Sequence, residues 1–71
     1  MTQRYRVVVG GPLPAALAEE VRGQLGPVDL RADRESTVLE VSCVDQPSLR
    51  GLLTRIFDNG LDVVDVTRVR Q

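Results

Sequence analysis

The side chains that usually carry out catalysis are scarce in this chain of 71 residues, which contains no histidine and no lysine. Cys43 is the only cysteine, and hydroxyl nucleophiles are supplied by residues such as Ser36, Ser42 and Ser48. A nucleophile needs a neighbouring base, and a carboxylate would have to take that role here. Because a free cysteine packs as a small apolar side chain, we expect Cys43 to be an inert buried thiol.

Two pairs of acidic residues have the chemistry of a hard-metal site or an acid–base pair: Asp62 with Asp65, and Asp29 with Glu40. Arginines are interspersed among all four, and surface ion pairing is the commoner use of such residues. We therefore predict no catalytic residues, no metal site and no cofactor.

Gly10, Gly11 and Pro12 follow the first apolar segment and form a different kind of candidate site. Glycines between a strand and a helix let backbone N–H groups approach an anion. A tight turn without a ligand has the same composition. Both uses remain open, and the three residues are a candidate ligand-binding site.

The composition excludes several classes of partner. Hydrophobic residues make up 42% and charged residues 27%, a globular balance, and the formal net charge is −1. Such a chain has no cationic field to attract nucleic acid or an anionic membrane. No apolar run is long enough for a signal peptide or a membrane span, and one cysteine cannot form an internal disulfide. We expect a single cytoplasmic domain that binds neither nucleic acid nor membrane.

Alternating apolar and polar residues predict four strands, at 4–9, 28–32, 37–44 and 61–69. The alternation is imperfect in the last strand, where Val63 and Val64 are adjacent. Either a bulge shifts the register near Val64, or Asp62 or Asp65 faces the helices at the end of the sheet.

Two helices are predicted between these strands. The first is predicted over 14–25, because apolar residues recur every four positions from Leu13 to Leu25 and Pro14 fits its first turn. The second helix has a stripe of apolar residues at i, i+3, i+4, i+7 and i+8, namely Leu49, Leu52, Leu53, Ile56 and Phe57. Asp45 or Gln46 can cap its start, Pro47 suits its first turn, and Asn59-Gly60 ends it.

The resulting order is βαββαβ, and right-handed crossovers then place both helices on one face of the sheet. We predict an α+β, ferredoxin-like sandwich spanning residues 1–71, with a four-stranded antiparallel sheet in the order 4-1-3-2. The expected core consists of Tyr5, Val7, Val9, Leu17, Val21, Leu25, Leu30, Leu39, Val41, Leu49, Leu52, Leu53, Ile56, Phe57, Leu61 and Val66.

The uncovered side of this sheet carries valines among charged residues, and the last strand adds Val64 and Arg68 to it. Single exposed valines are ordinary on a solvated face. A small domain also gains stability by burying such a face against a second subunit. We favour the interface, and predict a homodimer that uses Arg4, Arg6, Val8, Arg31, Val38, Glu40 and Val44.

Other families that share this strand order need residues that are missing here. Heavy-metal carriers of this topology have a C-x-x-C motif in the first loop, which here reads Gly10-Gly11-Pro12. RNA-binding domains stack bases on sheet aromatics, whereas this chain has one tyrosine and one phenylalanine. Acylphosphatases need an arginine loop and an asparagine that have no counterpart here.

The segment from Asp45 to Val63 resembles the ACT family of regulatory domains. DQPSLRGLL at 45–53, followed by a helix and then by Gly60, is similar to the family's D-x-P-G-L-L motif, with Ser48 in place of the glycine. The resemblance implies a βαββαβ fold, pairing through the sheet and an amino-acid-like effector near the first strand–helix loop. The implied ligand-binding residues are Gly10, Gly11 and Pro12 by position, and Asp45 and Ser48 by motif.

We therefore expect a non-catalytic regulatory or interaction module that self-associates through its sheet and binds a partner protein or a small effector. An alternative from another class is a small oligomeric enzyme of ferredoxin-like fold. It would use Arg6, Arg31, Glu40 and Asp65 in a pocket formed between subunits.

Overall fold

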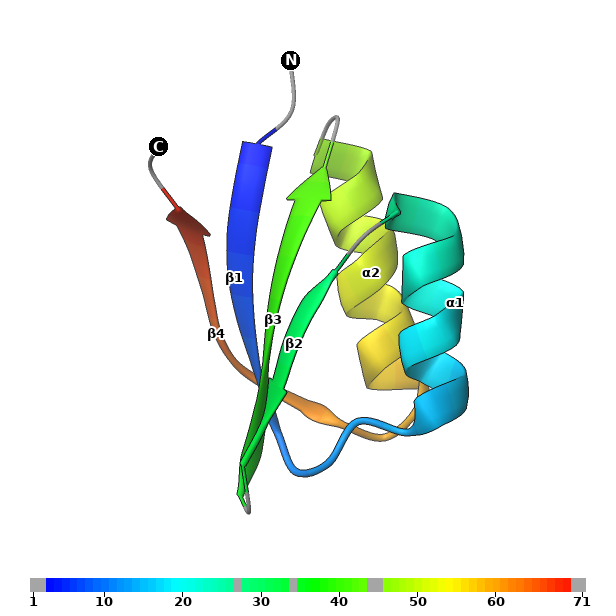
Figure 1. Cartoon of the computed structure of the whole chain (residues 1–71), viewed down its shortest axis with the longest axis vertical. Helices are drawn as coiled ribbons and strands as arrows, with labels where there is room; N and C mark the ends of the chain where they lie inside the picture. Colours follow the sequence, from blue (N-terminus) through cyan, green and yellow to red (C-terminus); the bar gives the residue numbers. More distant parts are fainter. Residues whose placement is uncertain (1–2, 27, 34, 44–45, 70–71) are drawn as a thin grey trace.

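The arrangement of the elements is that of a two-layer α+β domain (Figure 1). The computed structural model describes residues 3–26, 28–33, 35–43 and 46–69. Along the chain it contains β1 (Gln3–Gly10), α1 (Ala15–Leu25), β2 (Asp29–Ala32), β3 (Ser36–Cys43), α2 (Gln46–Asp58) and β4 (Asp62–Val69). The strand order is β2-β3-β1-β4, the predicted order read from the other edge, and all pairs are antiparallel. The predicted ferredoxin-like fold is confirmed.

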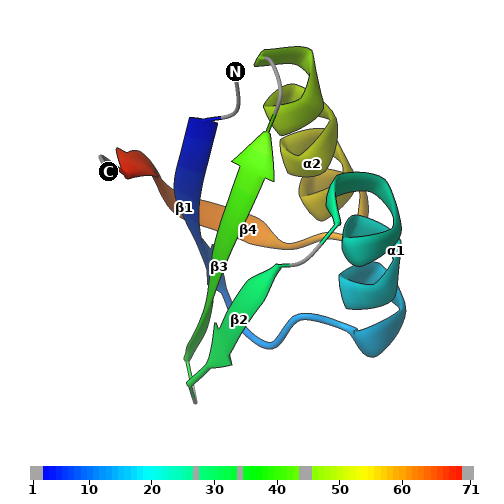
Figure 2. The same ribbon diagram turned by 45° about the horizontal axis from the view of Figure 1, so that its top comes forward.

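The core lies between the helices and one face of the sheet. The central ladder of β1 and β3 runs from Gln3 paired with Cys43 to Gly10 paired with Ser36. Both helices lie on the same side of this ladder (Figure 2). Alternate residues of the two strands are buried on that side. The buried residues are Tyr5, Val7, Val9, Thr37, Leu39 and Val41 from the sheet, and Leu17, Ala18, Val21, Leu49, Leu52 and Ile56 from the helices. Each large aliphatic side chain buried in this way contributes about 1.5–3 kcal/mol.

The ends of the helices follow from local backbone chemistry. α1 begins one residue later than predicted, because Pro14 is extended, with φ −59° and ψ 140°. At the end of α2, the Leu61 N–H donates to the Ile56 carbonyl at 3.3 Å and the Gly60 N–H donates to the Phe57 carbonyl at 2.9 Å. This is a Schellman motif, which needs a left-handed residue, and Gly60 has φ +76°. The predicted Asn59-Gly60 stop is confirmed.

A bulge interrupts the pairing of β4 with β1, as one of the two sequence interpretations predicted. Val8 pairs with Asp65 and Val9 pairs with Val63, so Val64 is the extra residue. Arg68 pairs with Tyr5 and therefore belongs to the helix side of the sheet. Its predicted position on the open face is wrong. The extra residue in the bulge exchanges the two sides of the sheet for the side chains that follow it in β4.

Two predicted core residues are exposed. Phe57 is 59% exposed because it follows buried Ile56 by one residue, about 100° around the helix. Val66 faces the helix side but is 38% exposed, since β4 curves away from the helices beyond the bulge (Figures 1 and 2). The predicted residues Leu25, Leu30, Leu53 and Leu61 pack as partly buried residues around the core.

No helix within the described part of the chain is both long and apolar enough to cross a membrane.

Candidate functional site

The face of the sheet opposite the helices is here called the open face (Figure 2). Two neighbouring rows of residues cross its centre. Strand pairing defines them. The first row crosses the sheet as Asp65, Val8, Val38 and Arg31, and the second as Thr67, Arg6, Glu40 and Asp29. Each row has one residue from every strand, so the two rows span the full width of the sheet.

The centre of the open face is apolar. Val8 and Val38 are direct partners on the two central strands, and both are half-buried. Val64 is 65% exposed at the bulge. A Cβ atom placed on Gly10 would lie 3.7 Å from Cγ2 of Val64, so this valine covers the glycine at the end of β1. Three valines therefore form a patch, here called the valine patch, between charged margins.

An ion-pair network lies beside the valine patch. Arg4 donates from Nη2 to Asp29 Oδ2 at 2.6 Å and from Nε to Glu40 Oε1 at 3.3 Å. Arg6 approaches the other oxygen of Glu40, with Nη2 3.9 Å from Oε2. The hydrogen bond that Arg4 donates to Glu40, with a further one to Asp29, raises the pKa of Arg4 above its ordinary value. Three strands are thus joined on this face by charge as well as by their backbones.

The two ends of the first row carry charges of opposite sign. Arg31 lies on β2 and Asp65 on β4, both exposed. Asp65 makes a local contact: its Oδ2 accepts a hydrogen bond from Thr67 Oγ1 at 2.7 Å. Within the described residues neither Arg31 nor Asp65 forms a salt bridge. From the sequence, the side of the sheet on which Asp65 lies was left open between two interpretations, because that side depends on the position of the bulge.

The predicted ligand-binding loop, Gly10 to Pro12, lies at the end of β1. The Gly11 N–H donates to the carbonyl of Glu35 at 2.8 Å, and the Gly11 carbonyl accepts a hydrogen bond from the Thr37 hydroxyl at 2.9 Å. Gly11 has φ +94°, which favours glycine. The Gly11 N–H is used to close the loop onto β3, so an anion at this loop would have to find other donors. Ligand binding at Gly10, Gly11 and Pro12 remains a prediction.

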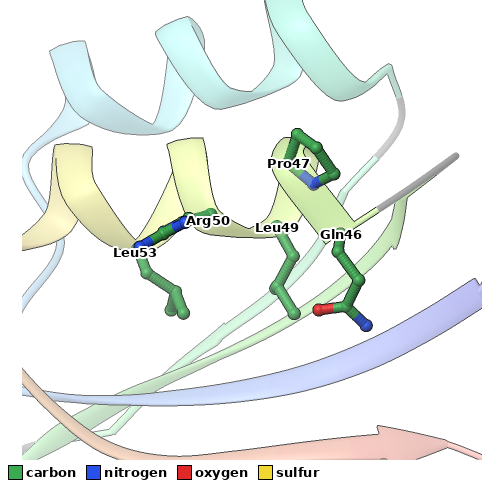
Figure 3. A pocket seen from close by; sticks show the side chains of 5 residues that line it. All are labelled: Gln46, Pro47, Leu49, Arg50 and Leu53. Atoms are coloured by element: carbon green, nitrogen blue, oxygen red, sulfur yellow. The ribbon is translucent and has the colours of Figure 1, made fainter.

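The second predicted ligand site, at the start of α2, borders a hollow in the surface. Ser48 is half-buried in the first turns of α2, and Asp45 lies outside the described residues, as does the predicted interface residue Val44. The hollow has a volume of about 410 Å³ and is lined by Gln46, Pro47, Leu49, Arg50 and Leu53 (Figure 3). The amide Nε2 of Gln46 donates to the hydroxyl oxygen of Tyr5 at 3.2 Å, which ties this end of α2 to β1.

The two predicted ligand sites lie at opposite ends of the sheet. Gly10 is at one end of the central ladder, and α2 starts just beyond Cys43 at the other. Seven steps of an antiparallel strand separate those ends by about 24 Å. One small ligand therefore cannot contact both sites within a single subunit.

The features that stand out among the described residues are surfaces that could bind a partner or a ligand. No three histidine, cysteine, aspartate or glutamate side chains within the described ranges gather into a metal-binding group. Asp29 and Glu40 are brought together, as their pairing implies, but both are bound by Arg4. What the arrangement offers is an apolar patch with charges at its margins, and a separate shallow hollow.

Comparisons with known proteins identify a family but no individual relative. No match was found among curated proteins or among solved structures. The model of one family matches residues 4–67, which include every helix and nearly all of every strand described above. This chain therefore belongs to the family described as a domain of unknown function (DUF8691).

Proposed function

We propose that this chain is a non-catalytic interaction module that forms a homodimer through its open face. The observation that carries the proposal is the valine patch with charged residues of both signs around it. Specific interfaces commonly have an apolar centre and a polar rim. Single exposed valines are ordinary on a solvated face, but here the exposed valine at the bulge lies beside two further valines, so the three form one apolar patch.

The size of the domain supports the same proposal. A typical stable interface buries about 800 Å² on each partner, which is about one sixth of the 4895 Å² surface of this chain. The helix layer covers one side of the sheet, and the open face is the side that the helices leave uncovered (Figure 2). Burial of this face adds a second apolar layer to a domain that has only one.

We further propose that the module is regulatory, acts in the cytoplasm and binds a small amino-acid-like effector in the hollow beside α2. The resemblance to ACT domains suggests an effector of this class. Leu49 and Leu53 offer an apolar wall, and Gln46 and Arg50 offer donors for a carboxylate (Figure 3). A few polar groups on an apolar wall are typical of small-molecule sites.

Light scattering with size exclusion tests the dimer. The wild-type chain of 7.8 kDa should show twice that mass at high micromolar concentration. Val8→Glu and Val38→Glu should each give the monomer mass, because each buries a charge at the centre of the proposed interface. Phe57→Glu, on the opposite side of the molecule, is the matched control and should stay dimeric. A wild-type monomer, or a dimer that survives both valine substitutions, would contradict the proposal.

A thermal-shift screen of the amino acids tests the effector. A ligand present at about 100 times its dissociation constant stabilises the folded chain by about 2.7 kcal/mol. The shift should be lost in Arg50→Ala and kept in Arg22→Ala, an exposed arginine on α1. If none of the amino acids raises the melting temperature, the effector half of the proposal is wrong while the dimer is unaffected.

A further inference from the structure

The charges at the two margins of the open face cannot meet within one subunit. Asp65 and Arg31 occupy the two ends of the same row, with Val8 and Val38 between them. Three inter-strand spacings separate them by about 14 Å. Neither side chain has an ion-pair partner among the described residues. The row is therefore acidic at one end, apolar in the middle and basic at the other end.

We propose that the occupant of the open face is a second copy of this chain, related by a two-fold axis that runs parallel to the strands, between β1 and β3. This inference rests on the proposed self-association and adds its geometry. Such an axis lies between two sheets packed face to face. It places β1 over β3 of the partner subunit, and β4 over β2 of the partner subunit.

This axis makes the open face complementary to itself. In the first row, Asp65 faces Arg31 of the partner subunit, and Val8 faces Val38 of the partner subunit. In the second row, Arg6 faces Glu40 of the partner subunit. Because the interface is two-fold, each contact occurs twice. Every charge in these contacts meets its opposite, and the valines meet valines.

The other simple arrangements of two stacked sheets are less favourable. A two-fold axis across the strands at the first row would place Asp65 against Asp65 of the partner subunit, and Arg31 against Arg31 of the partner subunit. Moving that axis to a point between the two rows would place Arg6 over Val8 of the partner subunit. The first arrangement places like charges against each other, and the second buries a charge against an apolar group. Both therefore cost free energy that the axis parallel to the strands avoids.

Charge exchange between the margins tests the geometry. Sedimentation equilibrium should show that Asp65→Arg and Arg31→Asp each raise the dissociation constant of the dimer by about tenfold or more, because each creates like-charge contacts twice. An equal mixture of the two variants should dimerise again. In the mixed dimer the side chain introduced by Asp65→Arg faces the one introduced by Arg31→Asp, and the unchanged Arg31 of the first chain faces the unchanged Asp65 of the second. Glu19→Arg and Arg22→Asp, both exposed on α1, carry the same charge changes away from the face and should dimerise as the wild type does.

The outcomes separate the two levels of the proposal. Loss of the dimer in each variant, followed by its recovery in the mixture, shows that both variants are folded and supports the axis parallel to the strands, because an axis across the strands predicts no loss in the single variants. A wild-type dimer that is disrupted by Val8→Glu, but that is unaffected by either charge reversal or is not recovered in the mixture, overturns this axis and leaves self-association in place. A wild-type monomer overturns both.

Discussion

The hydroxyl of Thr37 donates a hydrogen bond of 2.9 Å to the carbonyl oxygen of Gly11. Thr37 is fully buried in β3, beneath the helices. Together with the hydrogen bond from the Gly11 N–H to Glu35, this contact closes the loop after β1 onto the start of β3. The glycine loop is therefore positioned by a polar side chain that belongs to the core.

Thr37→Val should lower the free energy of unfolding by about 1–2 kcal/mol, because the shape is kept while the Gly11 carbonyl loses its partner. Urea denaturation measures the change. Thr54→Val, at an exposed position on α2, is the control and should change stability by less than about 0.5 kcal/mol. Equal stability of Thr37→Val and the wild type would show that the hydrogen bond is unimportant.

The same substitution should have opposite effects at two glycines of the second helical unit. Gly60→Ala should destabilise the chain by about 1–2 kcal/mol, since φ is +76° there. Gly51→Ala should stabilise it by about 0.5–1 kcal/mol, because Gly51 lies in α2 and a Cβ atom would have open space around it. Melting curves of the two variants measure these effects. A shift of the melting temperature in the same direction for both would contradict this description of α2 and its end.

Neighbouring residues of α2 should differ sharply in their contribution to stability. Ile56→Ala should cost about 2–5 kcal/mol, because this side chain is completely buried. Phe57→Ala should cost less than about 1 kcal/mol, since most of that ring is exposed. Denaturant titration of the two variants checks the rotation of α2, and a larger loss for Phe57→Ala would mean that the helix is turned differently.

The contribution of Arg4 should be insensitive to pH near neutrality. Its folded-state pKa is raised, chiefly by the hydrogen bond to Glu40. The stabilisation is therefore complete below the pKa of arginine in the unfolded chain, and is lost only as pH rises through the still higher folded value. Arg4→Gln should lower the melting temperature slightly and by the same amount from about pH 6 to about pH 9. Molar salt should remove the difference, and Arg68→Gln, which breaks no ion pair among the described residues, is the control.

Periodicity, together with the rule that crossovers are right-handed, was enough to predict the fold. The alternation in β1 and β3 and the stripe that contains Leu49, Leu52 and Ile56 correctly gave the element order, the strand order and most of the core. Thr37 was missing from the predicted core, which consisted of apolar residues and tyrosine, although it shares the parity of Leu39 and is fully buried. Phe57 was misplaced because the apolar stripe of α2 is wider than the part that reaches the sheet.

The candidate site was harder to predict, because it depends on registers between strands. The sequence pattern indicated a bulge near Val64 without fixing the partner of each residue, and that partner decides the face of Arg68 and Asp65. The two ligand predictions came from separate halves of the chain, and only the folded ladder shows that they lie at opposite ends of the sheet. Short motifs carry no information about such distances.

The most direct test of the account is a dilution series followed by methyl NMR. On dilution from millimolar to low micromolar concentration, the methyl signals of Val8, Val38 and Val64 should shift together with one dissociation constant. Those of Leu17 and Val21 in α1, buried on the other side of the sheet, should stay in place. Signals that do not move on dilution, or that move only on the helix side, would contradict a dimer formed through the open face.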